Sequence, residues 1–232
     1  MTGTNPVPLL SLLGIASATP LALLATAVCL FVTGMYNLRV GQSVHSPGNY
    51  MLGVTVCYGG IGQAITGILE FLAGSSIRGT LFTTLGMYWL SYGALSLPGF
   101  GIAPTATILE GSQTIMTLDP DYVAQLAIIS LSWTIVASLL WTLTWRTNLI
   151  NIILFFLVAL IQWLETVALF TRAESGSELR KVEGALMVLG ALFAWYFAMA
   201  LLCQKSLGSV YELPLGELPL KDEEEGLLSR PG

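Results

Sequence analysis

The chain has 232 residues, of which 54% are hydrophobic and 10% charged, and its net charge is −5. Soluble domains usually carry about 25% charged residues. Because six acidic and two basic residues follow Tyr211, the preceding residues have too few charges to cover a soluble core. The composition therefore excludes a soluble globular enzyme, and the lack of a basic patch excludes a nucleic-acid-binding protein. We predict an integral membrane protein.

Six stretches approach the roughly 20 apolar residues that a helix needs to cross a bilayer. The expected membrane-spanning helices cover residues 9–36, 50–72, 80–97, 122–145, 149–171 and 184–203. The fold class is therefore an all-α integral membrane protein with six transmembrane helices in a domain of residues 1–203. Residues 204–232, which include the run Asp222-Glu223-Glu224-Glu225, are expected to form a disordered acidic tail.

Two features along the chain interrupt this simple pattern. Pro20 lies inside the first stretch, where it removes a backbone donor and should kink or interrupt the helix. The turn signals Pro98-Gly99 and Asp119-Pro120 bracket one longer loop of about two dozen residues between the third and fourth helices.

Polar residues recur at helical spacing on one face of three predicted helices. They are Gly59, Gln63, Thr66 and Glu70 in the second, Thr80, Thr84, Tyr88 and Ser91 in the third, and Asn148, Asn151, Phe155, Gln162, Glu165 and Arg172 in the fifth. Such a face either bonds one helix to its neighbour or lines a narrow polar path.

The two carboxylates in these faces carry the stronger signal, because a charged side chain within a membrane normally faces a cavity or a partner. Glu70 lies near the end of its helix, so it belongs either to the headgroup region or to a path. Glu165 either pairs with Arg172 across two helical turns or lines the same path. Proton handling by Glu70 and a salt bridge at the helix end are both open.

Residue patterns typical of enzymes are missing from the sequence. There is no phosphate-binding glycine loop, haem or metal cluster, or nucleophile triad, and His45, the one histidine, lies in a loop. We therefore expect neither an enzyme nor a cofactor.

Four motifs resemble the acetate uptake transporter family, the YaaH-type succinate–acetate permeases and their fungal relatives. In chain order they are Asn5-Pro6-Val7-Pro8-Leu9, Tyr58-Gly59-Gly60-Ile61-Gly62-Gln63 with Gly67-Ile68-Leu69-Glu70, Thr80-Leu81-Phe82-Thr83-Thr84-Leu85-Gly86-Met87-Tyr88-Trp89-Leu90-Ser91, and Ala194-Trp195-Tyr196-Phe197-Ala198-Met199. The likeness covers spans one to three and six well, spans four and five loosely, and the tail not at all.

The resemblance implies a six-helix protomer in a hexameric ring, with a pathway for small monocarboxylates such as acetate through each protomer, with or without coupled protons. It places Asn5 where the carboxylate is met, just before a helix start whose free N–H groups favour an anion. Gln63 and Glu70 would line the pathway, and Ala194 and Tyr196 would lie beside its neck. The resemblance also implies the plasma membrane.

An apolar constriction in this family combines aromatic residues of spans one and three with a leucine of span five. Leu157 matches that leucine, whereas Gly14 and Leu85 stand where the family has the aromatic residues. A glycine at the first position should widen the constriction, so a larger monocarboxylate or a lost transport role are alternatives to acetate. A channel for a small neutral solute such as urea, and a non-transporting sensor or scaffold, are the competing functions.

Overall fold

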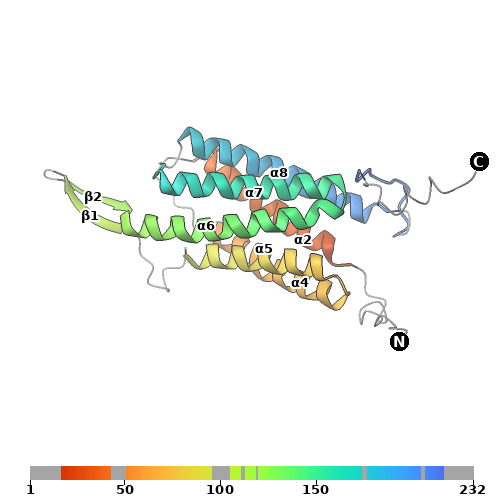
Figure 1. Cartoon of the computed structure of the whole chain (residues 1–232). Helices are drawn as coiled ribbons and strands as arrows, with labels where there is room; N and C mark the ends of the chain where they lie inside the picture. Colours follow the sequence, from red (N-terminus) through yellow and green to blue (C-terminus); the bar gives the residue numbers. More distant parts are fainter. Residues whose placement is uncertain are drawn as a thin grey trace, which may run out of the picture.

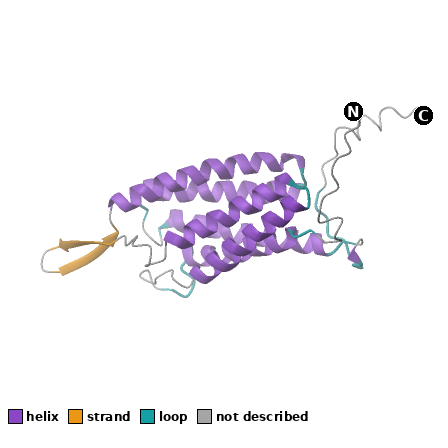
Figure 2. Cartoon of the chain, turned by 90° about the horizontal axis from the view of Figure 1, so that it is seen from below, coloured by secondary structure: helices purple, strands orange, loops and turns teal. Residues whose placement is uncertain are grey.

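The computed structural model describes residues 17–42, 51–95, 105–110, 113–118, 120–173, 177–204 and 207–216. Long helical segments lie side by side in one elongated bundle, and a hairpin projects from one end (Figures 1 and 2). The elements are α2 (Thr19–Asn37), α3 (Met51–Gly53), the π-helical η2 (Val54–Gly62), α4 (Gln63–Leu72), α5 (Ser76–Leu95), β1 (Thr105–Glu110), β2 (Gln113–Leu118), α6 (Pro120–Leu143), the 3-10 turn η4 (Thr144–Arg146), α7 (Leu149–Phe170) and α8 (Glu178–Leu202).

Five of the described helical segments are long and apolar enough to cross a membrane, which confirms an integral membrane protein. They are α2, the continuous α3–η2–α4 segment, α6, α7 and α8. The third expected span corresponds to α5, which is 20 residues long but less apolar, because Arg78 and several Thr, Gly and Tyr residues lie along it.

Helix starts differ from the expectation by several residues at three places, one of which is α5, which begins at Ser76 and not at residue 80. Helix α2 begins at Thr19 with Pro20 in its first turn, where a missing backbone donor costs nothing, and residues 9–16 of the first expected span lie outside the described residues. Helix α8 begins six residues before the expected Gly184, because the Ser177 side chain accepts a hydrogen bond from the Arg180 backbone N–H and caps the helix.

The expected loop between α5 and α6 contains an antiparallel hairpin, in which Thr105 pairs with Leu118 and Glu110 with Gln113. Threonine and isoleucine recur in both strands, and the two residues between the strands are Gly and Ser, a combination typical of tight hairpins. This hairpin lies at the end of the bundle that we call the hairpin end. Helix α2 begins and α8 ends at the opposite end, the tail end (Figure 1).

The order of helix contacts around the bundle is α5, α4 with η2, α2, α8, α7 and α6, and α6 touches α5 only slightly. Glycines allow the closest contacts: a Cβ on Gly34 of α2 would lie 2.8 Å from the Gly184 carbonyl of α8. A Cβ on Gly86 of α5 would lie 2.5 Å from the Ala64 backbone nitrogen of α4. The bundle is thus an open ring of tightly packed pairs with one weak contact.

Residues 207–216, part of the tail that we expected to be disordered, lie against the tail end of the bundle. The Leu149 and Ile150 N–H groups in the first turn of α7 donate to the Gly216 and Leu215 carbonyls at 2.9 and 3.4 Å. The Tyr196 hydroxyl donates to the Pro214 carbonyl at 2.8 Å. Because first-turn N–H groups have no partner inside their own helix, this segment completes the start of α7.

Candidate functional site

Two adjoining cavities of about 290 and 200 Å³ open the bundle at the hairpin end. Both are lined by Tyr88 and Tyr92 of α5, Glu165 of α7 and Arg180 of α8. We call them together the hairpin-end vestibule. Its wall combines aromatic rings with charged groups, so it can hold water and a small polar solute.

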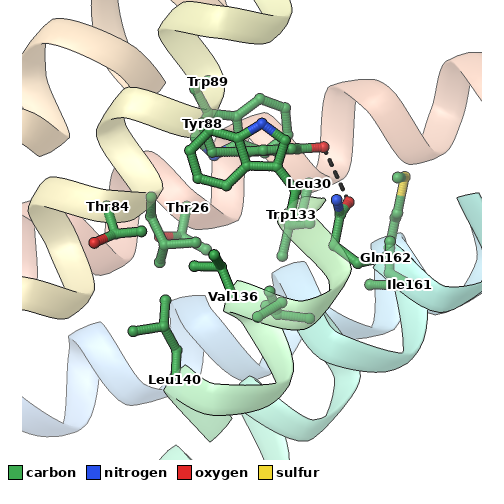
Figure 3. A pocket seen from close by; sticks show the side chains of 14 residues that line it. Thr26, Leu30, Thr84, Tyr88, Trp89, Trp133, Val136, Leu140, Ile161 and Gln162 are labelled. Carbon is green, nitrogen blue, oxygen red and sulfur yellow. Dashed lines mark hydrogen bonds between the residues drawn. The ribbon is translucent and has the colours of Figure 1, made fainter. Parts of the chain in front are cut away.

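A smaller inner cavity of about 40 Å³ lies deeper, between α2, α5, α6, α7 and α8. Tyr88 and Gln162 line both this cavity and the vestibule, and the Tyr88 hydroxyl donates to Gln162 Oε1 at 3.1 Å (Figure 3). Trp133 packs edge-on against Tyr88, with ring centroids 5.4 Å apart. The volume suits a few waters or one very small solute.

An apolar barrier closes the inner cavity on its far side. Four buried side chains pack together there, Leu81, Leu85, Leu140 and Phe155. Leu85 and Leu140 line the inner cavity, whereas Leu81 lines a separate cavity of about 600 Å³ at the tail end. One layer of side chains therefore separates two cavities that open towards opposite ends of the bundle.

We call the cavity at the tail end the tail-end vestibule. Three of its lining residues, Ser17, Thr19 and Arg78, bond the Glu70 carboxylate. Glu70 is fully buried and accepts hydrogen bonds from Arg78 Nε at 2.7 Å, Ser17 Oγ at 2.7 Å and Thr19 Oγ1 at 2.8 Å. Three donors directed at one carboxylate stabilise its charged form. The geometry favours the salt bridge at the helix end over proton handling by Glu70.

The polar face of the second span packs against α2. Cys29 lies next to Gly59, and the Gln63 side chain donates to the Ala22 carbonyl and to Thr26 Oγ1. Gln63 is fully buried and lines none of the described cavities. This face bonds two helices together, and Thr26 alone connects it to the inner cavity.

The residues of the predicted constriction lie in different places. Leu85 belongs to the apolar barrier, but the α7 residue in that barrier is Phe155, and Leu157 instead lies near Gly190 of α8. Ala194 is fully buried in a core cluster with Ala22 and Phe197. Asn5 and Gly14 lie outside the described residues, as does His45.

Tyr196 does not line the two vestibules or the inner cavity, and its hydroxyl bonds the tail segment at Pro214. Pathway contacts of Leu157, Ala194 and Tyr196 stay predictions. Within the residues that the structure describes, no three His, Cys, Asp or Glu side chains gather as metal ligands.

Glu165 pairs with Arg180 of α8, and the expected partner Arg172 instead has a left-handed backbone conformation with φ of 51° just after α7. Arg180 also binds Glu183, at 3.0 Å. Arg180 and Glu183 were not predicted as site residues from the sequence, because charged residues before the sixth span are typical of a loop. The one sequence signal for this helix start is Ser177, a residue type that often caps helices and that here accepts a hydrogen bond from the Arg180 N–H.

Membrane-crossing helices that surround cavities open towards both ends, with an apolar layer between them, define an integral membrane protein with an internal solute space. The chain belongs to the GPR1/FUN34/yaaH family, which it matches over residues 6–219.

Two relatives and one solved structure are similar to this chain. "Ammonia transport outward protein 2" of Saccharomyces cerevisiae is 33% identical over 80% of this chain and 61% of its own length. "Acetate permease A" of Emericella nidulans is 24% identical over 88% of this chain and 67% of its own length. The bacterial acetate channel SatP superposes with a TM-score of 0.71 at 20% identity, covering 87% of this chain and 99% of that one. This chain spans about three-fifths of the yeast protein.

Proposed function

We propose that the protein is a permease or channel for small monocarboxylates such as acetate. The observation that carries the proposal is the series of cavities from one end of the bundle to the other, with one apolar layer between the inner cavity and the tail-end vestibule. A solute would pass from the hairpin-end vestibule through the inner cavity and across Leu81, Leu85, Leu140 and Phe155 to the tail-end vestibule. The names of the fungal permease and the bacterial channel agree with this substrate class.

The chemistry of the barrier favours a neutral acid over a bare anion, because removing water from a carboxylate in apolar surroundings costs several kcal/mol. Four methyl-rich or aromatic side chains offer no donor to replace that water. The methyl group of acetate, in contrast, suits such surroundings. Passage is therefore easiest for a small carboxylic acid that carries its proton.

The assembly follows from the same proposal. Under this proposal α5 crosses the membrane together with the five more apolar segments, so that the protomer has six transmembrane helices. Large apolar side chains such as Ile128, Leu139 and Leu192 are exposed on the bundle and would contact lipid or a neighbouring protomer. The resemblance to the transporter family supports a homo-oligomer, a hexameric ring, in the plasma membrane.

Radiolabelled acetate uptake into proteoliposomes tests the proposal. Native protein should give saturable uptake above that of empty liposomes, and Leu85→Ala should speed it by thinning the barrier. Leu192→Ala is the matched control, since Leu192 is 53% exposed on the outer surface of α8. Uptake no faster than in empty liposomes would contradict the proposal.

A second candidate solute is ammonia, because the yeast relative is named for its outward transport. The hairpin-end vestibule is lined by two carboxylates and one guanidinium. When both carboxylates are ionised, this set of charges does not favour the binding of an anion. Competition separates the two candidates: acetate uptake that unlabelled acetate inhibits and ammonium does not supports the monocarboxylate.

A further inference from the structure

Three charged side chains meet at the hairpin end, where α7 and α8 lie against each other. One guanidinium nitrogen, Arg180 Nη1, donates to the Oε2 atoms of both Glu165 and Glu183, the latter at 3.0 Å. Their exposure decreases inward: the side chain of Glu165 is 21% exposed, that of Arg180 16%, and that of Glu183 is fully buried. All three residues line the vestibule, and Glu183 is the least exposed of them.

The charges in this cluster do not balance. Two ionised carboxylates on one guanidinium leave one negative charge, and burying an uncompensated charge is costly. Glu183 Oε1 has, moreover, no hydrogen-bond partner among the residues that the structure describes. A proton held between the two carboxyl groups would remove the excess charge.

Among the residues that the structure describes, the neighbouring helices contribute no cation to the vestibule walls. The titratable residues along the vestibule walls are Tyr36 of α2, Tyr88 and Tyr92 of α5 and Tyr122 of α6, all phenols that are neutral near pH 7. The Arg39 guanidinium stacks over the Tyr36 ring, 4.4 Å from its centroid. Arg180 is the cation that touches the two carboxylates among the described residues.

We propose that Glu165 and Glu183 hold one shared proton and that Glu183 delivers it to the carboxylate of the transported substrate in the hairpin-end vestibule. This inference rests on the proposed function and assigns the proton-carrying group within it. In the step, the O–H bond of the Glu183 carboxylic acid breaks and an O–H bond of the substrate acid forms. The negative charge passes from the substrate to Glu183, where Arg180 Nη1 binds it.

The remaining steps follow the cavities. Tyr88 lines the vestibule and the inner cavity, so a solute that leaves the cluster meets the Tyr88 hydroxyl and Gln162 next. The neutral acid can then cross the apolar barrier. A hydronium ion that reaches the more exposed Glu165 returns a proton to the pair and leaves as water, which restores the starting state.

Infrared spectroscopy of the purified protein tests the shared proton without any transport. The native protein should show the carbonyl-stretch band of a protonated carboxylic acid at neutral pH, and Glu183→Gln should lose it. Glu178→Gln is the matched control, because Glu178 lies on the same helix, 87% exposed and paired with Lys181. A native spectrum without the band, or one that Glu183→Gln leaves unchanged, would overturn the proposal.

Acetate uptake at acidic and neutral pH tests the delivery step. Native uptake should rise at acidic pH, and Glu183→Gln should lose that rise, whereas Glu183→Asp, which keeps a carboxyl group, should regain part of it. Size-exclusion profiles show whether each variant folds. A Glu183→Gln protein with the native acid-to-neutral ratio overturns the delivery step while acetate transport stands. If native protein moves no acetate, the proposed function fails, and the infrared band still decides the shared proton.

Discussion

Replacing Gly86 by alanine should destabilise the protein, because α5 and α4 approach too closely there for a side chain. The added Cβ would lie 2.5 Å from the Ala64 backbone nitrogen and 2.8 Å from the Gly60 carbonyl oxygen, whereas ordinary contacts begin at about 3.4 Å. The two helices would have to separate by about 1 Å, and such overpacking typically costs about 1–3 kcal/mol. Alanine regains a little less than about 1 kcal/mol of helix propensity, so the net loss should be about 1 kcal/mol.

Denaturant unfolding in detergent, followed by the fluorescence of the six tryptophans, measures this loss. Gly53→Ala is the matched control, since a Cβ there meets nothing within 4 Å and should raise the stability slightly. Gly86 also follows Leu85 directly, so a displaced α5 should alter acetate uptake. The reasoning is refuted if both alanine variants are as stable as the native protein or more so.

Two further changes test other contacts. Thr166→Val removes the hydroxyl that bonds Ser130 and Thr134 of α6, at 2.8 and 2.7 Å. It should lower the free energy of unfolding by about 1 kcal/mol in the same assay, and a variant as stable as the native protein would contradict this. Tyr196→Phe removes the bond to the Pro214 carbonyl, so amide hydrogen exchange of residues 207–216 should accelerate about fivefold by mass spectrometry, and unchanged exchange would show that the bond holds nothing.

Much of the fold was predictable because a bilayer demands long apolar segments. The second and fifth expected spans differ from the helices Met51–Leu72 and Leu149–Phe170 by one residue at most at each end. The first turns of α8 were missed because Glu178, Arg180 and Glu183 are charged, and hydropathy cannot tell a charged helical turn from a loop. These side chains form ion pairs with one another, with Lys181 and with Glu165, which only the packed structure shows.

The site was less predictable, because it depends on which face each helix turns inward. Leu85 lies in the apolar barrier, and α7 contributes Phe155 to it, two positions before Leu157, which stays a predicted constriction residue. Two residues correspond to more than half a helical turn, enough to move a side chain to another face. Glu165 was recognised as unusual, yet its partner lies 15 residues further along the chain, across the turn between α7 and α8.

The weak contact between α5 and α6 has a mechanical consequence. In the other neighbouring pairs of helices the backbones approach each other closely, in places at glycines. The distance between the two helices of such a pair can therefore hardly change. The barrier draws Leu81 and Leu85 from one side of the weak contact and Leu140 from the other. We therefore expect that the proposed path widens most easily when α5 and α6, which meet through side chains and not through close backbones, separate from each other.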